Sequence, residues 1–114
     1  MSKEMQLEIT TKGAVVVIGI RGDMTAVTGG AIEDAYRGMT RDGARKILFF
    51  FAKDCYINSG GIAILIGIAS ASRKNGQSIR AAGLSDHFQK IFNMMGLTKY
   101  VAIFSTEEEA LKDF

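Results

Sequence analysis

The chain has 114 residues, of which 47% are hydrophobic and 23% are charged, and its net charge is +2. This length suits one small domain, and the ordinary composition excludes a disordered tail. The small net charge does not favour a nucleic-acid-binding protein, which usually carries a concentrated basic face. We therefore expect a single domain over residues 1–114.

Cysteine usage and the N-terminal residues predict the compartment. Cys55 is the only cysteine, so an intrachain disulfide and a zinc site built from several cysteines are excluded. Residues 1–6 are mostly polar and lack the apolar core of a signal peptide. The longest apolar stretch, residues 60–71, is shorter than the roughly 20 residues that cross a bilayer. These features predict a cytoplasmic protein.

The first elements form a predicted hairpin. Residues 5–10 alternate between apolar and polar side chains, which is typical of a half-buried strand. A tight turn at Lys12-Gly13 leads into residues 14–20, an almost continuous apolar run. Such a short connection predicts an antiparallel pair. An exposed edge on the first strand is a surface with which another chain can pair.

A helix and a central strand are expected next. Residues 21–28 read as a polar, glycine-containing loop. Apolar side chains over residues 31–39 fall on one helical face, and this helix should end near Asp42-Gly43. Residues 46–52 are apolar without alternation and include Phe49, Phe50 and Phe51, all expected to be buried. This pattern predicts a strand covered on both faces.

The next predicted helix is largely buried. A polar segment, residues 53–59, leads into the apolar run of residues 62–72. Cations at Arg73 and Lys74, followed by Gly76, predict the end of that helix. A short strand is expected at residues 78–82.

An amphipathic helix, a last strand and a final helix complete the chain. The helix over residues 85–96 has one apolar face and is closed by Gly96, with Met94 and Met95 expected to fill the core. The last strand covers residues 101–104. Residues 105–108 fit a capping box for the final helix, in whose first turn the helix dipole favours carboxylates.

The resulting order is ββαβαβαβα. Alternation of strands and helices after an opening hairpin predicts an α/β fold with a mixed, mostly parallel sheet of about five strands and about four helices.

The usual enzyme patterns are absent from the sequence. His87 is the only histidine, so paired-histidine metal sites are excluded, and Cys55 lacks a base that the sequence places beside it. Neither Gly29-Gly30 nor Gly60-Gly61 has the spacing of a phosphate-binding loop. We therefore expect no catalysis, no cofactor and no metal.

One segment sits where sites collect in α/β folds. Residues 58–61, Asn-Ser-Gly-Gly, lie between a buried strand and a buried helix, at the carboxyl end of the strand. Ser59 is expected at or just before the helix start, where free N–H groups and the dipole suit an added negative charge. The simpler interpretation is that Asn58 or Ser59 only caps the helix, and the residues alone favour it.

Several segments together resemble the STAS-domain family of anti-sigma-factor antagonists. Residues 56–65, Tyr-Ile-Asn-Ser-Gly-Gly-Ile-Ala-Ile-Leu, are similar to the family signature, in which an Asp precedes a phosphorylated Ser or Thr. Residues 21–24, 92–97 and 104–111 resemble three further family segments in the same order. The resemblance covers nearly the whole chain and implies a single STAS-like domain.

The resemblance also implies a function. Such proteins bind an anti-sigma factor that is a serine kinase of the histidine-kinase-like ATPase type. This binding frees the sigma factor. Phosphorylation abolishes binding and a serine phosphatase restores it. The phosphoacceptor maps onto Ser59. The implied partner-binding residues are Asp23, Thr25, Thr28, Asn58, Ser59, Gly60 and Gly61.

This chain departs from the family pattern at four positions. Asn58 replaces the Asp before the phosphoacceptor, and Gly60 replaces a second Ser or Thr. Thr25 stands where an Asp is common, and Phe50 where an Asp or Asn is frequent. The expected surroundings of Ser59 are therefore less negative than in the family.

Two other function classes stay open. One is an adaptor subunit of a lipid-transport ATPase complex, or a stress-signalling scaffold, without a phosphorylation switch. The other is a carrier of a nucleotide or small ligand at the helix start near Ser59.

Overall fold

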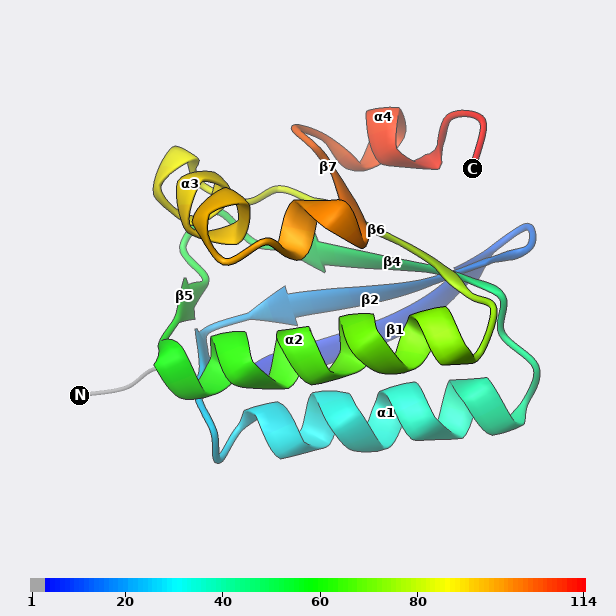
Figure 1. Cartoon of the computed structure of the whole chain (residues 1–114), viewed down its shortest axis with the longest axis horizontal. Coiled ribbons are helices and arrows are strands. Elements are labelled where there is room, and N and C mark those ends of the chain that lie inside the picture. Colours follow the sequence, from blue (N-terminus) through cyan, green and yellow to red (C-terminus); the bar gives the residue numbers. More distant parts are fainter. Residues whose placement is uncertain (1–3) are drawn as a thin grey trace.

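The computed structural model describes residues 4–114, which form one α/β domain (Figure 1). The elements, in chain order, are β1 (Gln6–Lys12), β2 (Val15–Arg21), β3 (Asp23–Met24), α1 (Gly29–Arg41), β4 (Lys46–Phe51), β5 (Tyr56–Ile57), α2 (Ser59–Lys74), β6 (Ser78–Ala82), α3 (Asp86–Met94), a 3-10 helix (Leu97–Lys99), β7 (Val101–Phe104) and α4 (Glu107–Leu111). The predicted order is confirmed, with two short strands and the 3-10 helix added.

The main sheet has five strands in the order β1-β2-β4-β6-β7. β1 pairs with β2 antiparallel, and the other pairs are parallel. This is the mixed, mostly parallel sheet predicted from the sequence. The carboxyl ends of β2 and β4 consequently lie at the same end of the sheet, where the start of α2 also lies (Figure 1).

Helices cover both faces of the sheet, but unequally. The larger apolar cluster joins one sheet face to α1, α2 and α3, and includes Ile18, Phe49 and Phe51. The smaller cluster joins the other face to α4, through Leu48 and Ala110 among others. The alternation of these side chains confirms that β4 is covered on both faces.

Four burial expectations were wrong. The helix α2 was expected to be largely buried, but only six of its 16 residues are buried, and Ile66 is 38% exposed. Phe50 is half-buried, because only the short α4 and the C-terminal residues cover its side of the sheet. β1 is mostly exposed rather than half-buried, since it is an edge strand, and Ile9 is 51% exposed. Met94 and Met95 are exposed at 83% and 53%, so they do not fill the core.

No helix within residues 4–114 is long and apolar enough to cross a membrane.

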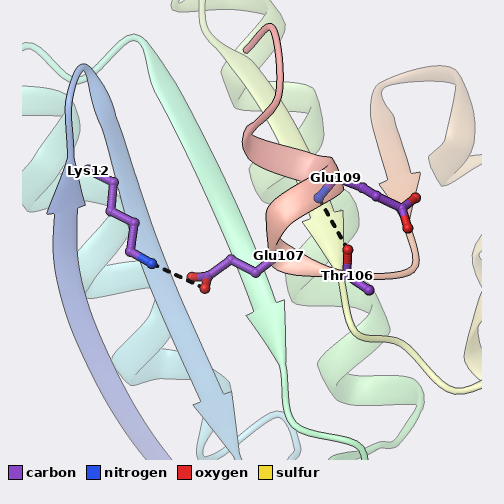
Figure 2. A network of polar contacts seen from close by, with 4 residues as sticks. All are labelled: Lys12, Thr106, Glu107 and Glu109. Atoms are coloured by element: carbon purple, nitrogen blue, oxygen red, sulfur yellow. Dashed lines mark hydrogen bonds and ion pairs between the residues drawn. The ribbon is translucent and has the colours of Figure 1, made fainter.

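A polar network fixes α4 to the hairpin (Figure 2). The hydroxyl of Thr106 accepts a hydrogen bond from the Glu109 N–H at 3.2 Å, so Thr106 is the N-cap. The capping box predicted from Ser105 is therefore shifted by one residue. Glu107, in the first turn as expected, accepts a hydrogen bond from the Lys12 ammonium at 3.1 Å.

Arg80 closes the other end of α4. One guanidinium nitrogen donates to the Ala110 and Lys112 carbonyls, both at 2.9 Å, satisfying groups that a helix end leaves free. The guanidinium also lies over two rings, 5.1 Å from the Phe104 centroid and 4.3 Å from the Phe114 centroid. A single side chain on β6 thus holds the only helix that covers this face of the sheet in the described chain.

Replacing Arg80 with Met should loosen α4. The aliphatic stem is retained, but the carbonyl hydrogen bonds and the ring contacts are lost, so the free energy of unfolding should fall by about 1–3 kcal/mol. The same change at Arg37, whose ion pairs on α1 are exposed, should cost less than about 0.5 kcal/mol. Urea denaturation measures the free energy of unfolding of both variants. Equal losses in the two would contradict the proposed role of Arg80 in holding α4.

Candidate functional site

A two-stranded sheet stands at the carboxyl ends of β2 and β4. Asp23 pairs with Tyr56 and Met24 with Ile57, in parallel register. The prediction that residues 21–28 form a loop is therefore wrong in part, and the polar segment of residues 53–59 contains the second short strand. Two-residue strands have no periodicity to detect, and the available signal was an apolar residue inside each polar segment, Met24 and Ile57, both buried.

The start of α2 follows directly from this small sheet. The Asn58 N–H donates to the Met24 carbonyl at 3.1 Å, which extends the pairing by one residue. The Asn58 side chain then accepts a hydrogen bond from the Gly61 N–H at 2.9 Å and is the N-cap. Ser59 is the first helical residue and is exposed. Asn58 therefore caps the helix, as one interpretation of the sequence predicted, and the Ser59 hydroxyl is not used as the cap.

Two threonines organise the loop before α1. The Thr28 hydroxyl donates to the Asp23 carbonyl and accepts from the Thr25 N–H, both at 2.8 Å. The Thr25 hydroxyl accepts from the N–H groups of Val27 and Thr28, both at 3.2 Å. The hydroxyls thus take the place of an N-cap for the turn that enters α1. The loop is held in one conformation by its own side chains.

Glycines allow this loop to lie against the start of α2. A Cβ atom at Gly60 would stand 2.7 Å from the Ala26 Cβ and 2.8 Å from the Ala26 nitrogen. A Cβ atom at Gly61 would stand 2.5 Å from the Met24 carbonyl oxygen. No side chain fits at these approaches without movement of the backbone. The departure from the family pattern at Gly60 is therefore matched by the position of the loop.

The face around Ser59 carries exposed apolar groups on both sides. On the loop side, Val27 is 87% exposed. On the other side a groove of about 380 Å³ runs between α2 and α3. The residues lining this groove are Tyr56, Ile57, Asn58, Ser59, Ile62, Ala63, Ile66, His87, Phe88, Ile91 and Met95. Most of them are apolar, so the exposed hydroxyl stands at the border of a surface suited to protein contact.

Cys55 and His87 do not form a nucleophilic pair. Cys55 is buried, and burial, with smaller contributions from Asp54 and Asp23, raises the pKa of its thiol to about 11. The thiol therefore stays protonated at neutral pH, whereas the nucleophilic form of a cysteine is the thiolate. His87 is exposed and packs against the Phe88 ring at 5.1 Å. Within residues 4–114 no three His, Cys, Asp or Glu residues are grouped as a metal site.

The structure brings the predicted site residues into one cluster. The cluster joins the loop with Asp23, Thr25 and Thr28 to the turn with Asn58 and Ser59, through the contacts described above. Val27 and the groove between α2 and α3 were not predicted from the sequence. The only signal for Val27 was its place as an apolar residue in a polar loop.

Comparison with known proteins decides the family. Residues 6–110 match the STAS domain family. The chain belongs to this family. An anti-sigma-B factor antagonist of Staphylococcus aureus is 25% identical over 93 residues, which cover 82% of this STAS domain and 86% of that protein. Anti-sigma-F factor antagonist RsfB of Mycobacterium tuberculosis is 27% identical over 105 residues, which cover 90% and 84%.

Solved structures share the fold of this STAS domain. An anti-sigma factor antagonist from Mycobacterium paratuberculosis superposes with a TM-score of 0.77 at 19% identity, covering 94% of this chain and 91% of that one. The Bacillus cell fate determinant SpoIIAA, in its phosphorylated form, superposes with a TM-score of 0.67 at 21% identity, covering 94% and 96%. At these identities the agreement concerns the architecture, and it confirms the predicted STAS-like fold.

A side chain at Gly60 should disturb the site. Gly60→Ala forces the loop at Ala26 away from α2, so the free energy of unfolding should fall by about 1–3 kcal/mol and the amide resonances of the loop should shift. Gly67 lies in the same helix with open space around it, so Gly67→Ala should instead stabilise by about 0.5–1 kcal/mol. Thermal denaturation and amide NMR spectra of both variants are the measurements. If Gly60→Ala left the free energy of unfolding unchanged, the close contact between the loop and the start of α2 would not be required.

Proposed function

We propose that this STAS domain is an anti-sigma-factor antagonist of the cytoplasm, and that phosphorylation of Ser59 switches its binding off. The observation that carries the proposal is the position of Ser59, an exposed hydroxyl on the first residue of α2 at the border of an apolar face. The names of the curated relatives support the antagonist function. That a protein of the same fold has a phosphorylated form supports the switch.

The start of α2 tolerates a phosphate within the domain. A phosphoryl group adds about −1.5 to −2 charges and three acceptor oxygens. At a helix start, backbone N–H groups and the positive end of the dipole face such an anion. The Asn58 side chain takes the Gly61 N–H, so the N–H groups of the first two helical residues are the ones oriented toward a phosphate. The fold therefore needs no rearrangement to accept the modification.

The same phosphate opposes docking. A partner that covers Ser59 would have to desolvate a dianion beside the apolar groove, which costs free energy wherever no cation pairs with it. A loss of about 3 kcal/mol lowers affinity more than a hundredfold. The switch thus acts through local charge and shape, and both states share one backbone.

The proposed partner is an anti-sigma factor that is also a serine kinase of the histidine-kinase-like ATPase type. A serine phosphatase would remove the phosphate and restore binding. The proposed contact residues are Asp23, Thr25, Thr28, Asn58, Ser59, Gly60 and Gly61. To these we add Val27, because it is the most exposed large apolar side chain in the described chain and stands on the ordered loop beside them.

Ser59 should be the single phosphoacceptor. Incubated with the cognate kinase and ATP, the protein should gain one phosphoryl group by intact mass, as should Ser70→Ala, which removes another exposed hydroxyl of α2. Ser59→Ala should gain none and should still bind the anti-sigma factor. Ser59→Asp should bind at least about a hundredfold more weakly with an unchanged melting temperature. Undiminished binding by Ser59→Asp would refute the switch and favour an adaptor or scaffold.

Val27 should anchor the partner. Val27→Asp places a charge where an apolar contact is proposed, so affinity for the anti-sigma factor should fall by roughly tenfold or more, without a change in stability. Ala102→Asp adds the same charge at an exposed position of β7 and should leave affinity unchanged. Calorimetric titration measures both variants. Equal affinities for the two would place the docking surface away from the loop.

A further inference from the structure

The outer edge of β1 is a complete and open strand edge. β1 has seven residues in full register with β2, from Gln6 opposite Arg21 to Lys12 opposite Val15. In the order of the main sheet β1 is terminal, so its second edge has no strand neighbour in the described chain. Six of its residues are exposed and the seventh is half-buried. β7, the other edge, has four residues.

The hydrogen-bonding groups on this edge follow from the hairpin turn. Gly13, with a φ of 61°, and Ala14 form a two-residue connection between Lys12 and Val15. A turn of this kind closes with a hydrogen bond between its flanking residues. Antiparallel pairing then alternates, so the backbone groups of Leu7, Ile9 and Thr11 point outward. They offer a regular ladder to another strand.

We propose that a second copy of this chain pairs antiparallel with β1, about a two-fold axis at Thr10. In this register Ile9 lies opposite Thr11 of the other copy, and Thr10 lies opposite its own copy. Glu8 lies opposite Lys12, and the symmetry makes this charge pair twice. β-branched pairs and opposite charges are the pairs that stabilise antiparallel strands. Ile9, now 51% exposed, is partly covered.

Charge complementarity is the reason to choose a second copy as the occupant. Charged side chains on an edge usually deter pairing. Here the two charges of β1 are opposite, and they stand four residues apart on the same side of the strand, which is the side of Glu107. Lys12 has three donors, so it keeps its contact with Glu107 while it meets the second carboxylate. In this arrangement the charges of the edge are complementary to those of its own copy.

This pairing leaves the proposed switch accessible. The centre of the pairing, Thr10, lies opposite Val17 of β2, whereas Ser59 stands beyond the carboxyl ends of β2 and β4. Val17 precedes Arg21, the last residue of β2, by four residues, so the centre of the pairing is about 13 Å from that end of the sheet. A dimer would therefore present two Ser59 faces, one from each copy. Two such faces on one particle would bind a dimeric partner with an added effect of effective concentration.

A contact limited to one strand edge is smaller than the interfaces of stable complexes. We therefore expect a weak, concentration-dependent dimer in which the charge pairs set the affinity. The pairing is independent of the proposed function, since it uses none of the residues assigned to partner binding.

Charge reversal tests the register. In Glu8→Lys both charge pairs become Lys–Lys, and in Lys12→Glu both become Glu–Glu, so each variant alone should self-associate about tenfold to thirtyfold more weakly than the native chain. Mixed together, the two variants regain opposite charges in both pairs and should associate within about threefold of the native affinity. Sedimentation equilibrium over a concentration series measures all four samples. A native chain that stays monomeric, or a mixture that does not recover, overturns the proposal.

Cross-linking gives a second test that does not depend on charge. Thr10→Cys places two thiols at a non-hydrogen-bonded pair, where Cα atoms are about 4.5 Å apart, a separation that suits a disulfide. Mild oxidation should give a covalent dimer. Thr11→Cys points to the opposite face and meets Ile9 of the other copy, so it should form no covalent dimer, and the buried Cys55 is common to both variants. Equal cross-linking of the two variants, or none, contradicts the register.

Discussion

The contact on which the site depends is the close approach of the β3–α1 loop to the first turn of α2. At Gly60 and Gly61 the approaching atoms belong mainly to the backbone and Cβ of Met24 and Ala26, which cannot rotate away as the end of a long side chain would. This contact fixes where the helix begins relative to the sheet. It also fixes where Ser59 stands, because the first residue of a helix has little freedom of its own.

The departures from the family pattern are consistent with this contact. An Asn caps a helix about as well as an Asp, so Asn58 preserves the start of α2 without a carboxylate. Thr25 accepts two backbone hydrogen bonds in the loop, a task that an Asp side chain also performs. Gly60 lacks the side chain that the loop would meet. The geometry around Ser59 is thus kept with neutral groups.

The sequence predicted the parts of this structure that depend on long apolar patterns. The five strands of the main sheet, the four helices and the position of Ser59 follow from periodicity, capping residues and glycines. The small sheet of β3 and β5 could not be predicted, because its pairing joins two-residue segments through tertiary contact. The predictions of burial were wrong at the periphery of the domain for a related reason. The amphipathic patterns of β1 and of the end of α3 give no information on whether another element covers them.

Neutral surroundings would change how the proposed phosphate on Ser59 acts. With a carboxylate on the preceding residue, the unmodified site would already repel an acidic partner, and the phosphate would add to an existing charge. With Asn58 in that place, the proposed phosphorylation would take the local charge of this turn from neutral to dianionic in one step. The charge that phosphorylation adds is the same with Asp or Asn at residue 58. With Asn58, however, the unmodified face is more compatible with an apolar contact. The exposed Val27 and the groove between α2 and α3 agree with a docking surface that relies on apolar burial when Ser59 is free, and on which a dianion is correspondingly costly.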